Sequence, residues 1–188
     1  MSGKRAEETP FTAAAGRLHA ERVGPIVSSA HLAEGQMPEL SELEFGLILA
    51  GHAFSRWIVR AMAAVGYPDL SALDVLVLHT VNHRGRTKTL ADICLVLNVE
   101  DTHTVSYALK KLQRLGLVES GRKGKEKTAA ITAEGEAACT AYREVRERLL
   151  IQSVQALGLE AGGVSTAADV LRALSGQYDQ SARAAASL

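Results

Sequence analysis

The sequence predicts a mainly helical protein with a single small β-hairpin. Apolar residues recur at helical spacing over most of the chain from residue 41 onward. Three segments open with Ser or Thr followed three residues later by Glu or Asp, which is the pattern of a capping box at a helix N-terminus. The apolar period changes from helical to alternating between residues 117 and 132, around glycines. These three observations define the fold class.

The bulk composition is that of an ordinary globular protein. The 188 residues carry 21 Lys+Arg against 21 Asp+Glu, which argues against a protein that coats nucleic acid indiscriminately. The two cysteines are far apart in sequence and form neither a disulfide framework nor a metal-ligand spacing. The first residues lack the apolar run of a secretory signal, and no apolar stretch is long enough to span a bilayer. We expect a soluble, cytoplasmic protein without a membrane partner or a cofactor.

Residues 1–40 are expected to form an N-terminal arm, partly disordered or helical, because Gly24-Pro25 interrupts it. Three helices then follow in order, each opened by a capping box and closed by a Gly or Asn stop signal. The boxes pair Ser41 with Glu44, Ser71 with Asp74, and Thr89 with Asp92, and the helices end near Gly66, Gly85 and Asn98.

A fourth helix begins at Asp101 or Thr102 and ends at Gly116, a position that favours a left-handed glycine. The segments "LVES" and "KTAAIT" are then short strands around the turn "GRKGKE". A long helix starts at Thr132, and "VSTAADVLRALSGQY" forms a final helix. The predicted parts are an N-terminal arm, a core, and C-terminal dimerisation helices, over 1–40, 41–150 and 133–188.

Two short helices joined by a tight turn and followed by a hairpin describe a winged helix-turn-helix. Its helix-turn-helix lies at about 89–115 and its wing at about 117–132. The second helix of such a unit enters the major groove of DNA. At about 100° per residue, four polar residues of this helix share a stripe opposite its apolar side. They are His103, Tyr107, Lys110 and Arg114. We predict that the stripe and its flanks contact DNA through Thr102, His103, Thr104, Ser106, Tyr107, Lys110, Lys111 and Arg114.

The hairpin gathers positive charge in an otherwise neutral chain. Cations around two glycines can approach a polyanion closely, and a partner of opposite charge offsets their mutual repulsion. A solvated helix face is the alternative explanation for the polar stripe alone, and its conjunction with the basic wing favours a DNA-binding surface. The predicted contacts of the wing are Arg122, Lys123 and Lys125, and those with the DNA backbone before it are Arg86, Lys88 and Thr89.

The sequence resembles the MarR-type bacterial transcription regulators over about residues 41 to 150. The segments "LSALDVLVLHTV", "TLADICLVLNVEDTHTVSYALKKLQRLGLVES" and "ITAEGEAA" carry the resemblance. It implies a homodimer with intertwined terminal helices, bound as a repressor to an inverted repeat and released by a small aromatic effector. The wing reads "GRKGKEK" in place of the family's Asp-x-Arg signature, so only its electrostatic role is carried over.

Other residue patterns lead to alternatives. His79 and His83 stand four residues apart but have no third ligand at a matching interval, so no metal site is predicted. Trp57 is either a core anchor or, with His52 and Arg56, the wall of an effector pocket. No nucleophile–base or carboxylate pair predicts an enzyme. The rival function is a winged-helix module that binds an acidic protein without sequence-specific DNA binding.

Overall fold

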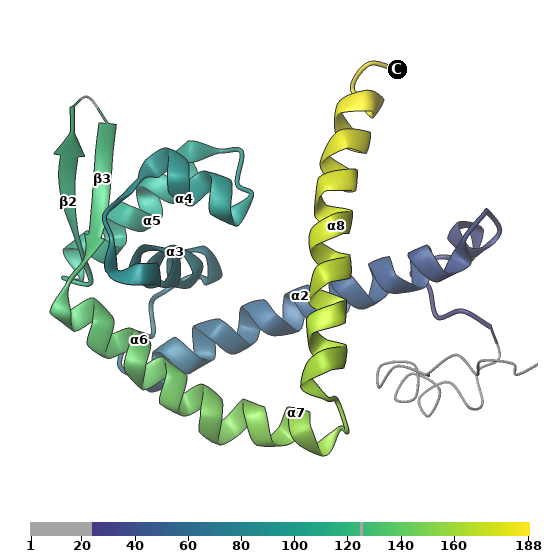
Figure 1. Cartoon of the computed structure of the whole chain (residues 1–188), viewed down its shortest axis with the longest axis horizontal. Helices are drawn as coiled ribbons and strands as arrows, with labels where there is room; N and C mark the ends of the chain where they lie inside the picture. Colours follow the sequence, from purple (N-terminus) through teal and green to yellow (C-terminus); the bar gives the residue numbers. More distant parts are fainter. Residues whose placement is uncertain (1–23, 125) are drawn as a thin grey trace, which may run out of the picture. The chain divides into compact units, whose positions relative to one another are not determined.

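The computed structural model describes residues 24–124 and 126–188 (Figure 1). It is mainly helical with one small sheet, as the sequence predicts. Ile26–Leu149 form one compact unit, and Leu150–Leu188 belong to a second. The elements of the first unit are η1 (Ala30–Ala33), α2 (Pro38–Ala64), α3 (Ala72–Asn82), η2 (His83–Gly85), β1 (Lys88–Thr89), α4 (Leu90–Leu97), α5 (Thr102–Arg114), β2 (Val118–Lys123), β3 (Glu126–Ile131) and α6 (Ala133–Arg146).

Two of the three predicted capping boxes form, at the N-termini of α3 and α4. The Ser71 hydroxyl accepts a hydrogen bond from the Asp74 N–H at 3.2 Å, and the Asp74 carboxylate accepts one from the Ser71 N–H at 2.8 Å. Thr89 and Asp92 make the same two bonds at 3.1 Å and 2.9 Å. Each box satisfies two N–H groups that the helix itself leaves without acceptors.

The capping box predicted at Ser41 is wrong. Helix α2 begins earlier, with Pro38 in its first turn. Proline suits that position because the N–H it lacks would have no acceptor there. The Ser41 hydroxyl instead donates to the Leu32 carbonyl at 2.8 Å, which ties α2 to η1.

The sheet has three strands in the order β1-β3-β2, all antiparallel. The hairpin β2–β3 was predicted, whereas β1 is too short to leave a period in the sequence. Strand β2 extends to Lys123, so Gly121 lies within a strand and not in the predicted turn. The turn itself passes through Gly124, whose φ of 62° is one that glycine adopts without strain. In Figure 1 the hairpin stands beside the helices α3, α4 and α5.

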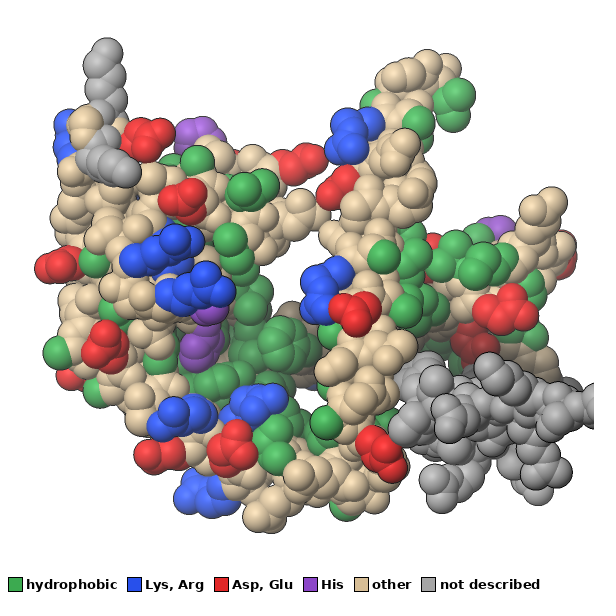
Figure 2. All heavy atoms as spheres, in the orientation of Figure 1, with side chains coloured by type: hydrophobic (Ala, Val, Ile, Leu, Met, Phe, Trp, Pro, Cys, Tyr) green, Lys and Arg blue, Asp and Glu red, His purple; other side chains and the backbone are tan. Residues whose placement is uncertain are grey.

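The core of this unit covers only the second half of α2. Ile58 and Ala61 are each 2% exposed, packed with buried side chains of the other elements. At about 100° per residue, Leu43, Leu47 and Phe54 lie on the same side of α2, yet they are 38%, 42% and 51% exposed. Figure 2 shows hydrophobic side chains along this part of the helix. One apolar stripe is thus buried at one end and uncovered at the other.

Helix α6 begins against the end of the wing, and Gly135 allows that close approach. A Cβ at Gly135 would lie 2.1 Å from the Leu117 carbonyl oxygen and 2.6 Å from Ile131 Cδ1. We expect Gly135→Ala to lower the free energy of unfolding by about 2–3 kcal/mol, because backbone must shift. Urea unfolding measures this free energy. The control is Gly176→Ala, where nothing lies within 4 Å of the new Cβ, and its free energy of unfolding should rise by up to about 1 kcal/mol. Equal changes in the two variants would contradict the prediction.

The second described unit consists of helices. A π-helical turn, η3 (Glu147–Ile151), leads from α6 into α7 (Gln152–Ala156), so the predicted long helix from Thr132 is continuous with a local widening. Helix α8 (Ala161–Ala185) follows, with Val164 and Val170 exposed by 49% and 44%. Among the described residues, no helix is both long and apolar enough to cross a membrane.

Candidate nucleic-acid interface

Helix α5 has the two-sided character that its sequence predicts. Asp101 caps its N-terminus by accepting a hydrogen bond from the His103 N–H at 2.9 Å. Val105 and Leu112 are completely buried, which fixes the helix on the core. The residues of the polar stripe, His103, Tyr107, Lys110 and Arg114, are all exposed. Leu115, which follows the last residue of the helix, is 41% exposed.

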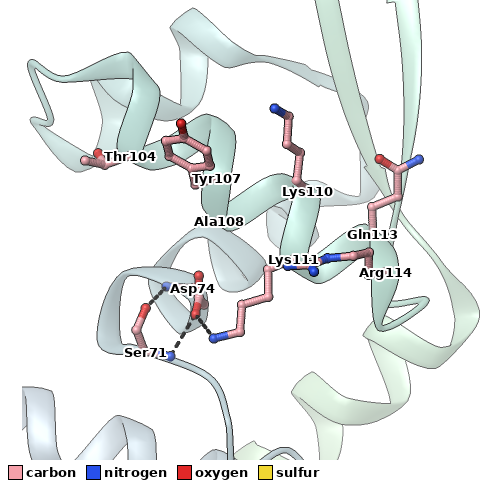
Figure 3. A pocket seen from close by; sticks show the side chains of 9 residues that line it. All are labelled: Ser71, Asp74, Thr104, Tyr107, Ala108, Lys110, Lys111, Gln113 and Arg114. Carbon is pink, nitrogen blue, oxygen red and sulfur yellow. Dashed lines mark hydrogen bonds and ion pairs between the residues drawn. The ribbon is translucent and has the colours of Figure 1, made fainter.

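An open groove of about 990 Å³ runs along α5 on the side of α3. Its α5 wall carries Tyr107, Lys110 and Arg114, and its α3 wall carries Ser71 and Asp74 (Figure 3). The Lys110 ammonium stands 5.4 Å from the centre of the Tyr107 ring, a cation–π arrangement. Tyr107 and Lys110 point away from Asp74 in Figure 3. This wall offers a phenol and two cations, Lys110 and Arg114, to solvent.

A second groove, of about 420 Å³, separates α5 from the wing. Leu90 and Leu109 supply apolar lining, and three cations line the groove: Lys110, Arg122 and Lys127. Arg122 and Lys127 are directly opposite each other across β2 and β3. Like charges in that position destabilise a hairpin. The wing and α5 therefore bring three positive charges to one groove, at a cost that a polyanion would offset.

Several predicted contact residues already have partners within the chain. The Thr104 hydroxyl donates to the Asp101 carbonyl at 2.7 Å, and the Thr89 hydroxyl is the acceptor in the α4 capping box. Lys111 forms an ion pair with Asp74 at 2.9 Å. These side chains have structural roles that their sequence positions did not reveal. Thr102 and Ser106, exposed and half-buried respectively, stay predictions.

Lys88 has to be removed from the predicted DNA contacts. It is only 6% exposed, and its ammonium donates to the carbonyls of Val81 at 3.1 Å and Arg86 at 3.2 Å, and to that of His83. The bonds close the turn between α3 and β1. Burial, followed by the nearby Arg86 charge, lowers the pKa of Lys88. The ammonium is thus turned inward, away from any phosphate.

The remaining predicted cations lie around the turn and at the wing tip. Arg86 is exposed, directly after the turn that contains the left-handed Arg84, whose φ is 62°. Arg122 is exposed on β2. Lys125 lies outside the described residues, and of Lys123 only the backbone is described. Sequence reasoning missed Lys127, whose place opposite Arg122 follows from the hairpin register, and Gln113, which lines both grooves.

The three residues predicted for an effector pocket do not share one environment. His52 and Arg56 are exposed on α2, whereas Trp57 packs against the core. Burial raises the pKa of Tyr142 of α6, and the neighbouring Trp57 indole partly opposes that shift. Tyr142 in turn lines a cavity of about 300 Å³, with Arg143 and Arg146 among its other residues. Among the described residues, no group of three His, Cys, Asp or Glu side chains is placed to hold a metal ion.

His79 lies between this cavity and the core and makes the fold sensitive to acid. Its ring meets that of Tyr142 edge-on at 4.6 Å, and its Nε2 is buried without a hydrogen-bond partner among the described residues. Burial lowers the pKa of His79 below its ordinary value. As the pH falls through about 6.5, the unfolded chain takes up a proton that the folded chain resists, so stability falls.

We therefore expect the thermal midpoint of unfolding to decrease between pH 7.5 and pH 5, with a smaller decrease in His79→Leu. The variant titrates no imidazole at this position, so one source of proton uptake on unfolding is gone. Thermal melts over this pH range measure the difference. His83→Gln, at an exposed histidine, is the control and should follow the wild-type profile. A His79→Leu profile parallel to wild type would contradict the expectation.

Comparison with known proteins gives the class first. Residues 70–135 match the model of a family described as a winged helix DNA-binding domain. This segment contains α3, the helix-turn-helix and the whole wing. This segment is therefore similar to winged helix DNA-binding domains, and it is the segment where the two grooves flank α5. No curated protein sequence matches the chain.

Solved structures then show which regulators share the fold. BldR from Sulfolobus solfataricus is 17% identical over 76% of this chain and 99% of its own, with a TM-score of 0.62. A cysteine-to-serine mutant of MarR from E. coli, complexed with operator DNA, is 20% identical over 74% and 98%, with a TM-score of 0.59. Reduced AbfR bound to DNA is 19% identical over 76% and 96%, with a TM-score of 0.63. The resemblance to MarR-type regulators is confirmed at the level of the fold.

Proposed function

We propose that this protein is a sequence-specific, double-stranded DNA-binding transcription regulator, acting as a repressor. The observation that carries the proposal is the second groove, where Lys110 of the recognition helix α5 meets Arg122 and Lys127 of the wing. A helix that fits the major groove, beside a hairpin that crowds like charges, matches the chemistry of duplex DNA. Two of the similar solved structures are described as bound to DNA, which supports the same function.

We further propose that the regulator acts as a homodimer. Leu43, Leu47 and Phe54 form an uncovered apolar stripe on α2. Contiguous exposed apolar surface of this kind marks a protein interface. A two-fold symmetric dimer presents two recognition helices and reads an inverted repeat with half-sites about one helical turn apart.

The effector is proposed as a small aromatic acid. The resemblance to MarR-type regulators supports its existence, and the cavity beside Tyr142 supports the acid, because Arg143 and Arg146 line it. Arginine pairs with carboxylates through two parallel hydrogen bonds. A raised thermal midpoint with benzoate, lost in Arg143→Ala, is the expected result. If substitution of His52 or Arg56 abolishes the rise in the thermal midpoint instead, the effector site lies on the outer face of α2.

Selection from a genomic fragment library tests the function as a whole. The purified protein should enrich fragments that contain an inverted repeat, and affinity for them should fall steeply with salt. The repressor role is tested by a reporter placed behind the selected fragment, whose expression should fall when the protein is present. Capture of an acidic protein without retention on DNA would favour the winged-helix interaction module instead.

A further inference from the structure

The Asp74 carboxylate links α3 to the recognition helix. Asp74 is 5% exposed and sits in the first turn of α3. Its Oδ2 accepts a hydrogen bond from the Ser71 N–H at 2.8 Å and lies 2.9 Å from the Lys111 ammonium. The same ammonium donates to the Asp69 carbonyl in the turn before α3. Figure 3 shows Lys111 reaching across to Asp74.

This arrangement distinguishes two adjacent lysines on one helix. Lys110 is exposed and points to solvent above Tyr107, so it is available to an external anion. The Lys111 ammonium, by contrast, neutralises a buried carboxylate. If it moved to a phosphate, Asp74 would be left as a buried charge without its counter-ion, which is strongly unfavourable. Lys111 therefore has a partner that DNA would have to replace.

The pair also acts on the groove that faces outward between α3 and α5. Asp74 lines this groove together with Tyr107, Lys110 and Arg114. Paired with the Lys111 ammonium, the carboxylate adds no net charge to this groove. The carboxylate is held in position by the capping box of α3, so it cannot turn away. Lys111 thus cancels a negative charge on the proposed interface.

We infer that Asp74 and Lys111 form a strut that positions the recognition helix, and that Lys111 is a positioning residue and not a DNA contact. The part of this inference that concerns DNA rests on the proposed function. The strut joins the last turn of α5 to the N-terminus of α3 and to the turn before it. Base contacts require a reading helix to be held to a fraction of an ångström, so its loss reduces selectivity and leaves phosphate binding in place.

Duplex binding by Lys111→Met and Asp74→Asn tests this against a phosphate contact. For Lys111→Met the ratio of specific to non-specific affinity should fall on the order of tenfold, with an unchanged salt slope. Asp74→Asn keeps a cap acceptor but frees Lys111, so its ratio should fall similarly while its salt slope steepens by about one. The double variant should be no less selective than either single variant. Arg122→Met, in the wing, is the control whose slope should flatten by about one.

The inference is overturned if Lys111→Met flattens the salt slope as Arg122→Met does, or if the two substitutions have additive effects. Urea unfolding of the free protein separates the strut from the proposed function. Each single variant should unfold at lower urea than wild type, and the double variant should lie well short of the sum. If wild type binds no duplex, the proposed function fails while this coupling still supports the strut. Independent effects on unfolding would overturn the strut whatever the DNA result.

Ser71→Ala is the matched control for helix stability. It removes the acceptor of the Asp74 N–H and leaves the ion pair with Lys111 in place. The variant should unfold at lower urea, because a cap is lost, yet its ratio of specific to non-specific affinity should equal that of wild type. A tenfold fall in that ratio would mean that any loosening of α3 reduces selectivity, and the specific role of the Asp74–Lys111 pair would be overturned.

Discussion

Leu47→Glu is expected to give a monomer that loses at least about 100-fold in affinity for its inverted repeat. Leu47 is 42% exposed in the single chain and lies at the centre of the uncovered stripe on α2. In the proposed dimer this position faces the partner, and a buried carboxylate without a counter-ion would oppose association. The two half-sites would then bind independently, without the gain of simultaneous binding.

Sedimentation equilibrium measures the assembly, and fluorescence anisotropy on the selected repeat measures the affinity. His52→Glu introduces the same charge on the opposite side of α2, at an exposed position, and should leave both quantities unchanged. A dimeric Leu47→Glu variant with full affinity would show that the dimer uses another surface. A reversal, with His52→Glu monomeric and Leu47→Glu dimeric, would place the interface on the other side of the helix.

How far the sequence predicts this fold depends on whether a signal is local. The boxes at Ser71 and Thr89 form as predicted, since both partners of each box lie within one turn of helix. The pattern at Ser41 is equally good locally. There, a proline three residues earlier starts the helix, and the hydroxyl is used by η1. A tertiary contact decided this case, and no local pattern records it.

The candidate site was predictable as a surface but not as a set of contacts. Helical spacing places Tyr107, Lys110 and Arg114 on one exposed side, as the structure shows. The direction of a long flexible side chain is different, because it depends on where the fold places its acceptors. The Lys88 ammonium donates to one carbonyl in the last turn of α3 and to two in the turn that follows it. Lys111 pairs with Asp74, 37 residues before it. Counting cations therefore overstated the charge available to DNA.

Register explains the opposite error, the omission of Lys127. In the sequence, Lys127 is the first residue of the predicted strand "KTAAIT", after the predicted wing turn. Because the turn is confined to the two positions between Lys123 and Glu126, Lys127 comes to lie opposite Arg122. A two-residue connection is the commonest hairpin loop, so this register was accessible in principle. The longer predicted turn concealed it.

Lys110→Ala is expected to weaken binding to the selected repeat by about 1–3 kcal/mol and to leave binding to unrelated duplex almost unchanged. Lys110 is the one cation that lines both grooves beside α5 and is free of an ion pair in the described structure. In the proposed complex, the Lys110 ammonium would donate to the acceptors of guanine in the major groove. The loss should be greatest for repeats that carry guanine at one position and should vanish when that position is changed.

Two matched variants decide whether this effect is base reading. Tyr107→Phe keeps the aromatic ring under the Lys110 ammonium and removes only the hydroxyl, so it should retain the guanine preference. Arg122→Ala removes a wing cation of the same groove and should weaken all duplexes alike, with a flatter salt slope. If Lys110→Ala behaves like Arg122→Ala, Lys110 binds phosphate. Base selectivity would then have to come from the first turns of α5, where His103 is exposed.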